Sequence, residues 1–147
     1  MEKEQFITIM DENIKLIRAE YGLTQEKMAP ILGISKKTLV EIEKKRKSLG
    51  WTGSVALASM FSDSKILSKV FGGSISDVII TIAFRDTQVT YPKTWGGEIW
   101  WKTVEEKNGY RIQQNMVSRH YRILDQKNRR LLATYHYEEA KETLDQL

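Results

Sequence analysis

Basic side chains gather in one short stretch of the sequence, between Ser35 and Ser48. The stretch carries Lys36, Lys37, Lys44, Lys45, Arg46 and Lys47, against the two acidic residues Glu41 and Glu43. Such a run is usually only a solvated helix face, so its meaning depends on the elements around it. Lysine ammonium groups can bind phosphate oxygens, or donate to guanine O6 and N7 in the major groove of DNA. The chemistry that these residue types permit is nucleic-acid binding.

Four residues of this stretch, two of them basic, fall on one side of a helix that is expected to begin after Ser35. They are Lys36, Lys37, Val40 and Glu41, and they lie opposite the apolar Leu39 and Ile42. Lys44 falls on the same side, at the far end of the helix. The two lysines can donate to guanine, Glu41 can accept from cytosine N4, and Val40 can contact a thymine methyl. The N-terminal part of a recognition helix is the part that enters the major groove. We therefore expect base contacts from these four residues.

Phosphate contacts are expected from a second group of residues. They are Gln25, Ser35, Lys44, Lys45, Arg46 and Lys47. Gln25 and Ser35 stand where helices are expected to begin, and free backbone amides at such positions favour anions. The four basic residues add positive charge that attracts the DNA backbone whatever its sequence.

Two capped helices would position these side chains. Thr24 can cap a helix that ends at Gly33, and Ser35 can cap the next one. The short turn Leu32-Gly33-Ile34 between them is the spacing of a helix-turn-helix. An ordinary corner between two helices of a small bundle fits the same spacing.

The motifs around this turn are more specific than the spacing. They are Gly22-Leu23-Thr24-Gln25, Met28-Ala29, Leu32-Gly33-Ile34-Ser35, Thr38-Leu39 and Ile42-Glu43. With these motifs, residues 11–71 resemble the phage-repressor-like helix-turn-helix family (Cro and xenobiotic-response-element type). The resemblance implies a sequence-specific double-stranded DNA-binding transcriptional regulator, with repression as the expected role. It also implies a phosphate contact by Gln25 and base contacts by Lys36, Lys37 and Glu41.

Two residues depart from the family pattern. Pro30 lies inside the second helix, where it removes a backbone donor and crowds the carbonyl of Glu26, at a cost of about 3 kcal/mol or a kink. Lys44 and Lys45 stand where the family usually has glycine. We therefore expect the exit from the recognition helix to be one turn longer or differently angled.

Further helices complete the N-terminal part. Ile7, Met10, Ile14, Ile17 and Tyr21 form the apolar stripe of a first helix over residues 3–21, although Asp11 could cap a shorter one. Residues 48–51 are expected to form a connection, and residues 55–61 a fourth helix. A fifth helix is expected to begin after Ser62 or Ser64. Residues 74–84 combine helix caps with the β-branched run Val78–Ile82, and we favour a helix.

The composition changes after Arg85 toward aromatic and β-branched residues. Residues 99–107 are typical of a strand, and Asn108-Gly109 indicates a hairpin to a partner strand from Tyr110 onward. Tyr91-Pro92 and Gly96-Gly97 indicate a loop before the first strand. Residues 125–128 are expected to form a second turn, and residues 129–135 a third strand. Residues 138–147 are expected to form a helix whose Ala140 and Leu144 face inward.

The sequence thus predicts an α+β fold. An all-α helix-turn-helix domain with five helices occupies residues 1–73, and a connecting helix and loop occupy 74–97. A small antiparallel β-meander with a C-terminal helix occupies 98–147, as a dimerisation or sensing module.

Aromatic residues of the second half are candidates for a dimer interface. Trp100 and Trp101 are neighbours, so in a strand they face opposite ways; one would lie in the core and the other needs a partner surface. Two-fold pairing would place two recognition helices about 34 Å apart on the DNA, so we expect a homodimer. The alternative interface is on the fourth and fifth helices, with Trp51 and Phe61. A nucleic-acid stacking platform is poorly supported, because no basic-aromatic motif accompanies these residues in the sequence.

Several other classes of function are disfavoured. The chain of 147 residues has 41% hydrophobic and 29% charged residues, a net charge of +4, and no cysteine, which excludes disulfides and thiolate sites. His120 and His136 lack a third ligand pattern for zinc, and Glu105 and Glu106 face opposite ways on a strand. No phosphate-binding glycine loop is present. We therefore expect no metal, no cofactor and no enzymatic activity.

No apolar run approaches the length of a membrane span, and the first residues lack a signal-peptide core. We expect a cytoplasmic protein without a membrane partner. Two alternatives to the regulator stay open: an antitoxin-like or adaptor module that binds a partner protein, and a regulator that senses a small molecule through its aromatic half. Co-purification of a second polypeptide or of a metabolite would discriminate between them.

Overall fold

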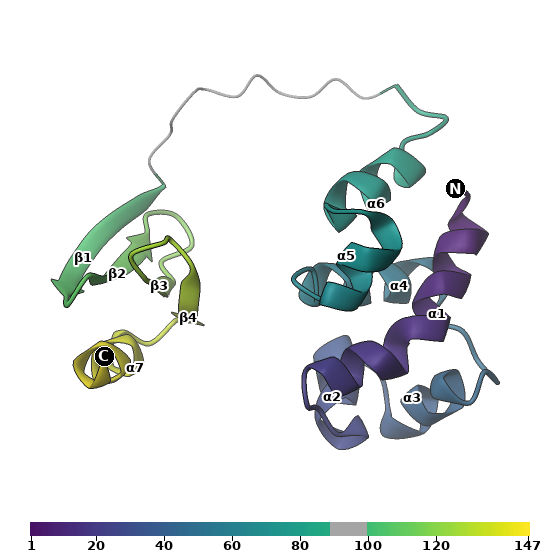
Figure 1. Ribbon diagram of the computed structural model, residues 1–147, viewed down its shortest axis with the longest axis horizontal. Coiled ribbons are helices and arrows are strands. Elements are labelled where there is room, and N and C mark those ends of the chain that lie inside the picture. The colour runs from purple at the N-terminus through teal and green to yellow at the C-terminus, as the bar shows by residue number, and fades with distance from the viewer. Residues whose placement is uncertain (89–99) are drawn as a thin grey trace. The chain divides into compact units, whose positions relative to one another are not determined.

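The computed structural model describes residues 1–88 and 100–147 of the chain (Figure 1). It divides into two compact units, Met1–Tyr91 and Pro92–Leu147. The first unit is helical, and the second is a four-stranded antiparallel sheet with a C-terminal helix, which confirms the predicted α+β class. The predicted loop motifs Tyr91-Pro92 and Gly96-Gly97, and Ile99 of the predicted strand, lie outside the described residues.

Helices make up the described part of the first unit. They are α1 (Lys3–Glu20), α2 (Gln25–Leu32), α3 (Lys36–Glu43), α4 (Gly50–Met60), α5 (Lys65–Phe71) and α6 (Ile75–Ala83). The core is built on α1, whose Phe6, Met10, Ile14 and Ile17 are completely buried. The apolar stripe therefore begins at Phe6 rather than Ile7, and it ends before Tyr21, which is exposed. Fully buried residues of α2, α3 and α4 pack around it.

The two central helices begin where the sequence predicts, and α2 also ends at the predicted glycine. The Thr24 hydroxyl accepts from the backbone N–H of Lys27 at 3.3 Å, and the Ser35 hydroxyl accepts from that of Thr38 at 3.1 Å. Gly33 ends α2 with a left-handed φ of 71°, which glycine adopts without steric cost. Capping and turn chemistry thus produce the helix-turn-helix geometry of α2 and α3.

One boundary differs from the prediction, the start of the fourth helix, and three alternatives that the sequence left open are decided. Asp11 caps no helix: it lies inside α1, and its Oδ1 accepts from the backbone N–H of Leu49 at 2.8 Å. The fourth helix begins at Gly50, so the connection predicted over residues 48–51 is shorter. Ser64, rather than Ser62, caps α5 by accepting from Leu67 N–H. The ambiguous segment 74–84 forms α6, whose Ile75 and Ile82 are buried in the core.

Pro30 is accommodated without a break in α2. The helix runs on to Leu32, so only the bond to the carbonyl of Glu26 is lost. Pro30 is exposed, which lets water reach this face of the helix.

Among the described residues, no single helix is long and apolar enough to cross a membrane. The pair α5 and α6 reaches that length and composition only together, across a bend of 51°.

The second unit is a meander in the order β1-β2-β3-β4. Its strands are β1 (Trp101–Lys107), β2 (Tyr110–Asn115), β3 (Tyr121–Leu124) and β4 (Arg130–Thr134), followed by α7 (Tyr137–Gln146). The predicted hairpin at Asn108-Gly109 is confirmed, with positive φ angles of 52° and 81°.

One turn of the meander was not predicted. The strand expected from Tyr110 onward breaks after Asn115, so β2 and β3 are separate strands and the sheet has four rather than three. The Asn115 side chain accepts from the backbone N–H groups of Val117 and Ser118, both at 3.0 Å, and Arg119 has a φ of 65°. An asparagine whose side-chain oxygen accepts a hydrogen bond from the backbone N–H two residues later commonly starts a turn.

The sheet has one covered face and one open face. Helix α7 packs on the face that carries Ile112 and Ile123, and its Ala140 and Leu144 are completely buried there, as predicted. Trp101 pairs with Asn115 on the opposite face, and Trp100 is 51% exposed. The expectation that one of these tryptophans lies in the core is therefore wrong, because the register aligns Trp101 with the face that α7 does not cover.

The exit from α3 also differs from the expectation. The helix ends at Glu43 without an extra turn, and Lys45 takes a left-handed φ of 60°. A side chain with a Cβ is strained in this conformation by about 1 kcal/mol relative to glycine. The chain thus keeps a backbone geometry suited to glycine at a position occupied by lysine.

We predict that Lys45→Gly raises the free energy of unfolding by about 0.5–1 kcal/mol, because it removes this strain. Lys44→Gly is the matched control: it removes the same charge one residue earlier, where φ is −84°. There glycine adds only unfolded-state entropy and should destabilise. Urea denaturation of both variants measures the difference, and equal shifts in the two would contradict the strain at Lys45.

Candidate nucleic-acid interface

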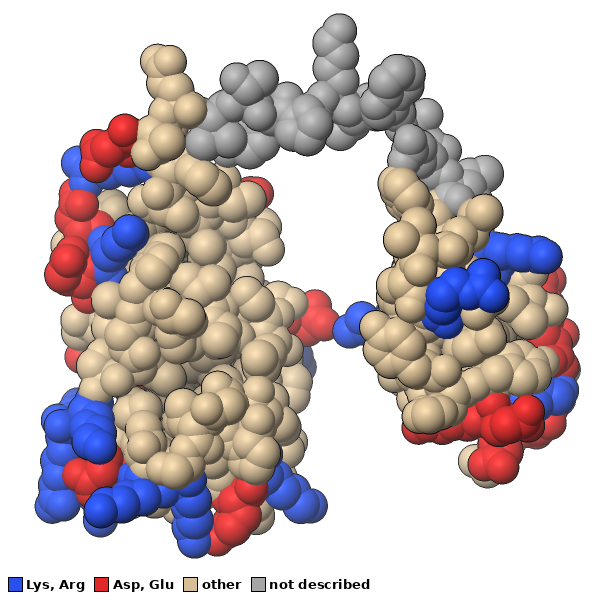
Figure 2. Space-filling model, turned by 180° about the vertical axis from the view of Figure 1, so that it is seen from behind, with Lys and Arg blue, Asp and Glu red and all other residues tan. Residues whose placement is uncertain are grey.

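The outer side of α3 carries the four residues predicted to contact bases. Lys36 and Lys37 are exposed and Val40 and Glu41 are half-buried, whereas Leu39 and Ile42 on the inner side are buried in the core. Figure 2 shows basic side chains gathered at the end of the first unit where α2 and α3 lie. The structure therefore brings these four residues together on one accessible surface.

Two of these residues are engaged in ion pairs. The Lys36 ammonium pairs with the Glu26 carboxylate of α2, and this hydrogen bond lowers the pKa of Glu26. Glu41 lies 3.8 Å from the Arg46 guanidinium. The Lys36–Glu26 pair joins two exposed side chains, and such pairs contribute little to stability. Lys36 can therefore exchange Glu26 for a nucleic-acid group at small cost.

The predicted phosphate-binding residues fall into two groups. Lys44, Lys45, Arg46 and Lys47 are all exposed in the loop after α3. Beside them a hollow of about 400 Å³ is lined by the 45–48 segment and by Thr8, Asp11 and Glu12 of α1. The Asp11 bond to Leu49 N–H ties the end of this loop to α1.

The second group, Gln25 and Ser35, has structural partners. Gln25 Nε2 donates to a Glu43 oxygen at 2.8 Å, and the Ser35 hydroxyl donates to Thr38 Oγ1 at 2.9 Å while it caps α3. Because the Gln25 amide has two N–H groups and this bond uses one, the side chain keeps a donor for another acceptor.

Glu43 joins the three helices of the motif. Arg18 of α1 donates from Nε and Nη2 to the two Glu43 oxygens, at 2.6 and 3.1 Å, and its Nη1 donates to the Leu23 carbonyl. The side chains of Arg18 and Glu43 are only 17% and 5% exposed. Burial acts to raise the pKa of Glu43, but the bonds from Arg18 and Gln25 outweigh it and hold that pKa below its usual value.

Sequence reasoning missed the role of Arg18 and Glu43 as positioning residues. Glu43 was noted only as an acidic residue of the basic stretch and as part of the Ile-Glu motif, and Arg18 was not singled out. A signal was available, since Arg18 lies in the last turn of α1 and Glu43 in the last turn of α3. Their pairing could not be deduced from spacing, because 25 residues separate them.

Comparison with known proteins agrees with this geometry. Residues 14–56 match the Helix-turn-helix family, of the type found in Cro and C1 repressors. This segment is similar to the phage-repressor-like helix-turn-helix. No curated protein and no solved structure matches the chain.

The matched segment of the helix-turn-helix runs from the middle of α1 to within α4 and includes both α2 and α3. The resemblance inferred from the sequence motifs is thereby confirmed for this part of the chain. The matched family is one of DNA-binding transcription regulators, and the match supports DNA binding by this segment. The second unit lies outside the match.

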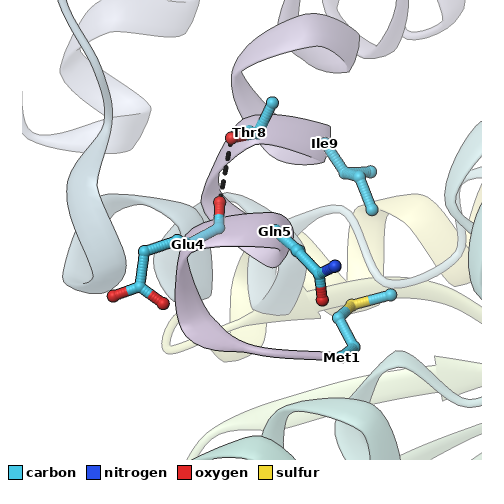
Figure 3. A pocket seen from close by; sticks show the side chains of 5 residues that line it. All are labelled: Met1, Glu4, Gln5, Thr8 and Ile9. Atoms are coloured by element: carbon cyan, nitrogen blue, oxygen red, sulfur yellow. Dashed lines mark hydrogen bonds between the residues drawn. The ribbon is translucent and has the colours of Figure 1, made fainter.

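A hollow of about 480 Å³ near the N-terminus offers a poor alternative site. It is lined by Met1, Glu4, Gln5, Thr8 and Ile9 (Figure 3). Thr8 Oγ1 donates to the Glu4 carbonyl at 2.9 Å, and Gln5 Oε1 accepts from Glu2 N–H, so these polar groups are already used within α1. The helix-turn-helix surface remains the candidate functional site.

We predict that Glu43→Gln destabilises the first unit by about 3 kcal/mol, because it leaves the Arg18 charge largely buried and unpaired. Since the folded pKa of Glu43 lies below its unfolded value of about 4.3, the stabilisation is complete above that pH and is lost as the pH falls through the folded pKa. As the pH falls below about 4.3, the free energy of unfolding should therefore decrease less in Glu43→Gln than in the wild type, because the variant has no carboxylate to protonate at this position.

Thermal denaturation at neutral pH and in mildly acidic buffers measures both effects. Glu26→Gln is the control, because its partner Lys36 is exposed and its loss should change stability by no more than about 0.5 kcal/mol. Equal stability of Glu43→Gln and the wild type at neutral pH would rule out the positioning role.

Proposed function

We propose that the protein is a sequence-specific double-stranded DNA-binding regulator that reads the major groove with α3 and acts as a repressor. The observation that carries this proposal is the accessible outer side of α3, with a basic loop at its end and its inner side packed in the core. An α-helix fits the major groove, and base-edge contacts there distinguish all four base pairs.

The recognition contacts follow from the positions on α3. Lys36 and Lys37 lie in its first turn and would donate to guanine O6 and N7. Val40 and Glu41 lie one turn further on, where they would contact a thymine methyl and a cytosine amino group. Glu41 would also repel nearby phosphates, which restricts the register in which the helix can dock.

The remaining contacts would be with the DNA backbone. Lys44, Lys45, Arg46 and Lys47 would bind phosphates next to the groove, and Gln25 would use its free N–H group. Ser35 would contribute chiefly through the helix start that it caps. Repression then needs only occupancy of a promoter, since a bound protein blocks access to the same DNA.

We predict that Lys37→Ala and Glu41→Ala each change the preferred base at particular positions, by about 1–3 kcal/mol where the contact is well formed. Selection of bound sequences from a random duplex pool, for the wild type and each variant, measures the preference. It also reports the length and symmetry of the site.

The double variant Lys45→Ala and Arg46→Ala is the matched control, because both residues are exposed in the loop and are assigned to phosphates. It should weaken all duplexes alike and lower the slope of log K against log salt by about one unit per lost contact. Unaltered base preferences in both α3 variants would show that this helix does not read the groove.

We predict that the chain of 147 residues forms a homodimer. Of the four aromatic residues singled out for the interface, Phe61 is buried in the core and Trp101 packs against Arg122. Trp51 is half-buried against Phe6, and Trp100 is largely exposed. Trp100 and Trp51, which lie in different units, are therefore the residues to test.

Light scattering on the full chain and on a chain that ends at Phe84 separates these cases. A dimer that needs the second unit would implicate Trp100, and loss of the dimer in Trp100→Ser would support it. A dimeric shortened chain would place the interface on the helices. A full chain that stays monomeric at micromolar concentration, with and without DNA, would overturn the prediction.

The adaptor and ligand-sensing alternatives stay predictions. A second polypeptide that co-purifies in fixed proportion would favour the adaptor, and a bound metabolite would favour the sensor. Failure of the wild type to enrich any duplex from the random pool would favour either of them over the DNA-binding regulator.

A further inference from the structure

The open sheet face, opposite α7, combines basic and aromatic side chains. Its register rows bring Arg111 of β2, Arg122 of β3 and Arg130 of β4 onto this face, together with Trp101 and Gln113. Sheet spacing of about 5 Å between strands places the three arginines within reach of one another. The basic-aromatic association that the linear sequence lacks is thus produced by strand pairing.

Neutral groups hold two of these arginines in place. The Arg122 guanidinium lies 3.7 Å above the Trp101 ring, and its Nε and Nη2 donate to Gln113 Oε1 at 3.0 and 2.8 Å. Arg111 donates from Nη2 to the amide oxygen of Asn128. These partners orient the guanidinium groups but leave their charge unneutralised.

Other arginines of the chain are bound differently. Arg18 pairs with Glu43, and Arg129 pairs with the largely buried Asp125 at 2.7 Å. Within residues 1–88 and 100–147, by contrast, Arg111, Arg122 and Arg130 form no ion pair with a carboxylate, although Glu106 is the register partner of Arg111. Arg18 and Arg129 are thus held by carboxylates of their own unit, whereas the arginines of the open sheet face have no such partner among the described residues.

The three charges also act on one another. Burial lowers the pKa of Arg122, and the nearby charges of Arg111 and Arg130 lower it further. A cluster of like charges in fixed positions is relieved by an external anion, and guanidinium groups match phosphate oxygens in geometry. The same repulsion disfavours pairing of this face with a second copy of itself.

We propose that the open sheet face is a second DNA-binding surface, on which Arg111, Arg122 and Arg130 bind phosphates of the duplex that α3 reads. This inference rests on the proposed function, because the helix-turn-helix delivers the same chain to double-stranded DNA. Strands are an established means of binding duplex grooves. Single-stranded DNA is a weaker fit, since it needs open aromatic faces and the Trp101 ring is covered by Arg122 and packed against His120.

The test uses the full chain with Arg111→Gln and Arg130→Gln together, which leaves the Arg122–Trp101 contact in place. Binding is measured by fluorescence anisotropy, over a series of salt concentrations, on a duplex with the selected site and its flanks. We expect affinity to fall roughly three- to tenfold for each arginine removed. We expect the slope of log K against log salt to fall by about 0.9 for each lost phosphate contact.

Lys102→Gln is the matched control. Lys102 is an exposed residue of β1, and its partner Gln114 belongs to the rows that face α7. This variant removes one charge from the same sheet and should bind as the wild type does. Arg130→Gln alone covers the case in which the double variant fails to fold, because Arg130 is exposed and has no side-chain hydrogen bond in the described parts of the chain.

The outcomes separate this inference from the proposed function. If the double variant keeps wild-type affinity and salt slope while Lys37→Ala loses base preference, the sheet surface is refuted and the recognition by α3 stands. If the wild type binds no duplex, both the proposed function and this inference are overturned. If the double variant loses affinity only for a single-stranded oligonucleotide, the open sheet face binds single strands and the inference is overturned.

Discussion

The orientation of α3 depends on one largely buried carboxylate. Glu43 at the end of α3 accepts two hydrogen bonds from Arg18 of α1 and one from Gln25 of α2. Hydrophobic packing of Leu39 and Ile42 is non-directional and leaves α3 free to rotate or slide by small amounts. A bidentate pair fixes direction, since both guanidinium donors must match both oxygens. The outer side of α3 is thereby held at one angle to the rest of the domain.

This arrangement links the start of α2 to the end of α3. Gln25, expected from family resemblance to bind phosphate, also donates to Glu43. A phosphate contact at Gln25 would therefore act on a side chain already oriented by the Arg18–Glu43 pair. In the proposed DNA complex, the phosphate contact of Gln25 and the orientation of α3 would thus share one hydrogen-bonded group.

The two units of the chain use arginine in contrasting ways. In the first unit Arg18 is neutralised by a carboxylate and serves the fold. In the second unit Arg122 rests on an indole and an amide, so its charge is held in place but not cancelled. The difference lies in the partner rather than in the residue, and it distinguishes a structural cation from one available to an anion.

The sequence by itself determined the local structure of the motif. Thr24, Gly33 and Ser35 act within a few residues through capping and left-handed turns, and the Asn108-Gly109 hairpin acts in the same way. The outer side of α3 followed from helical periodicity alone. Sequence patterns did not predict two boundaries, the turn after Asn115 and the start of α4 at Gly50.

Only the tertiary structure decided which distant side chains meet. The Arg18–Glu43 pair, the Asp11–Leu49 bond and the arginine cluster of the open sheet face join residues from separate elements. Strand register decided the side of the sheet on which Trp101 lies, because a shift of one residue turns every side chain of a strand to the other face. Such contacts depend on how elements pack and pair, and no spacing within a single element specifies them.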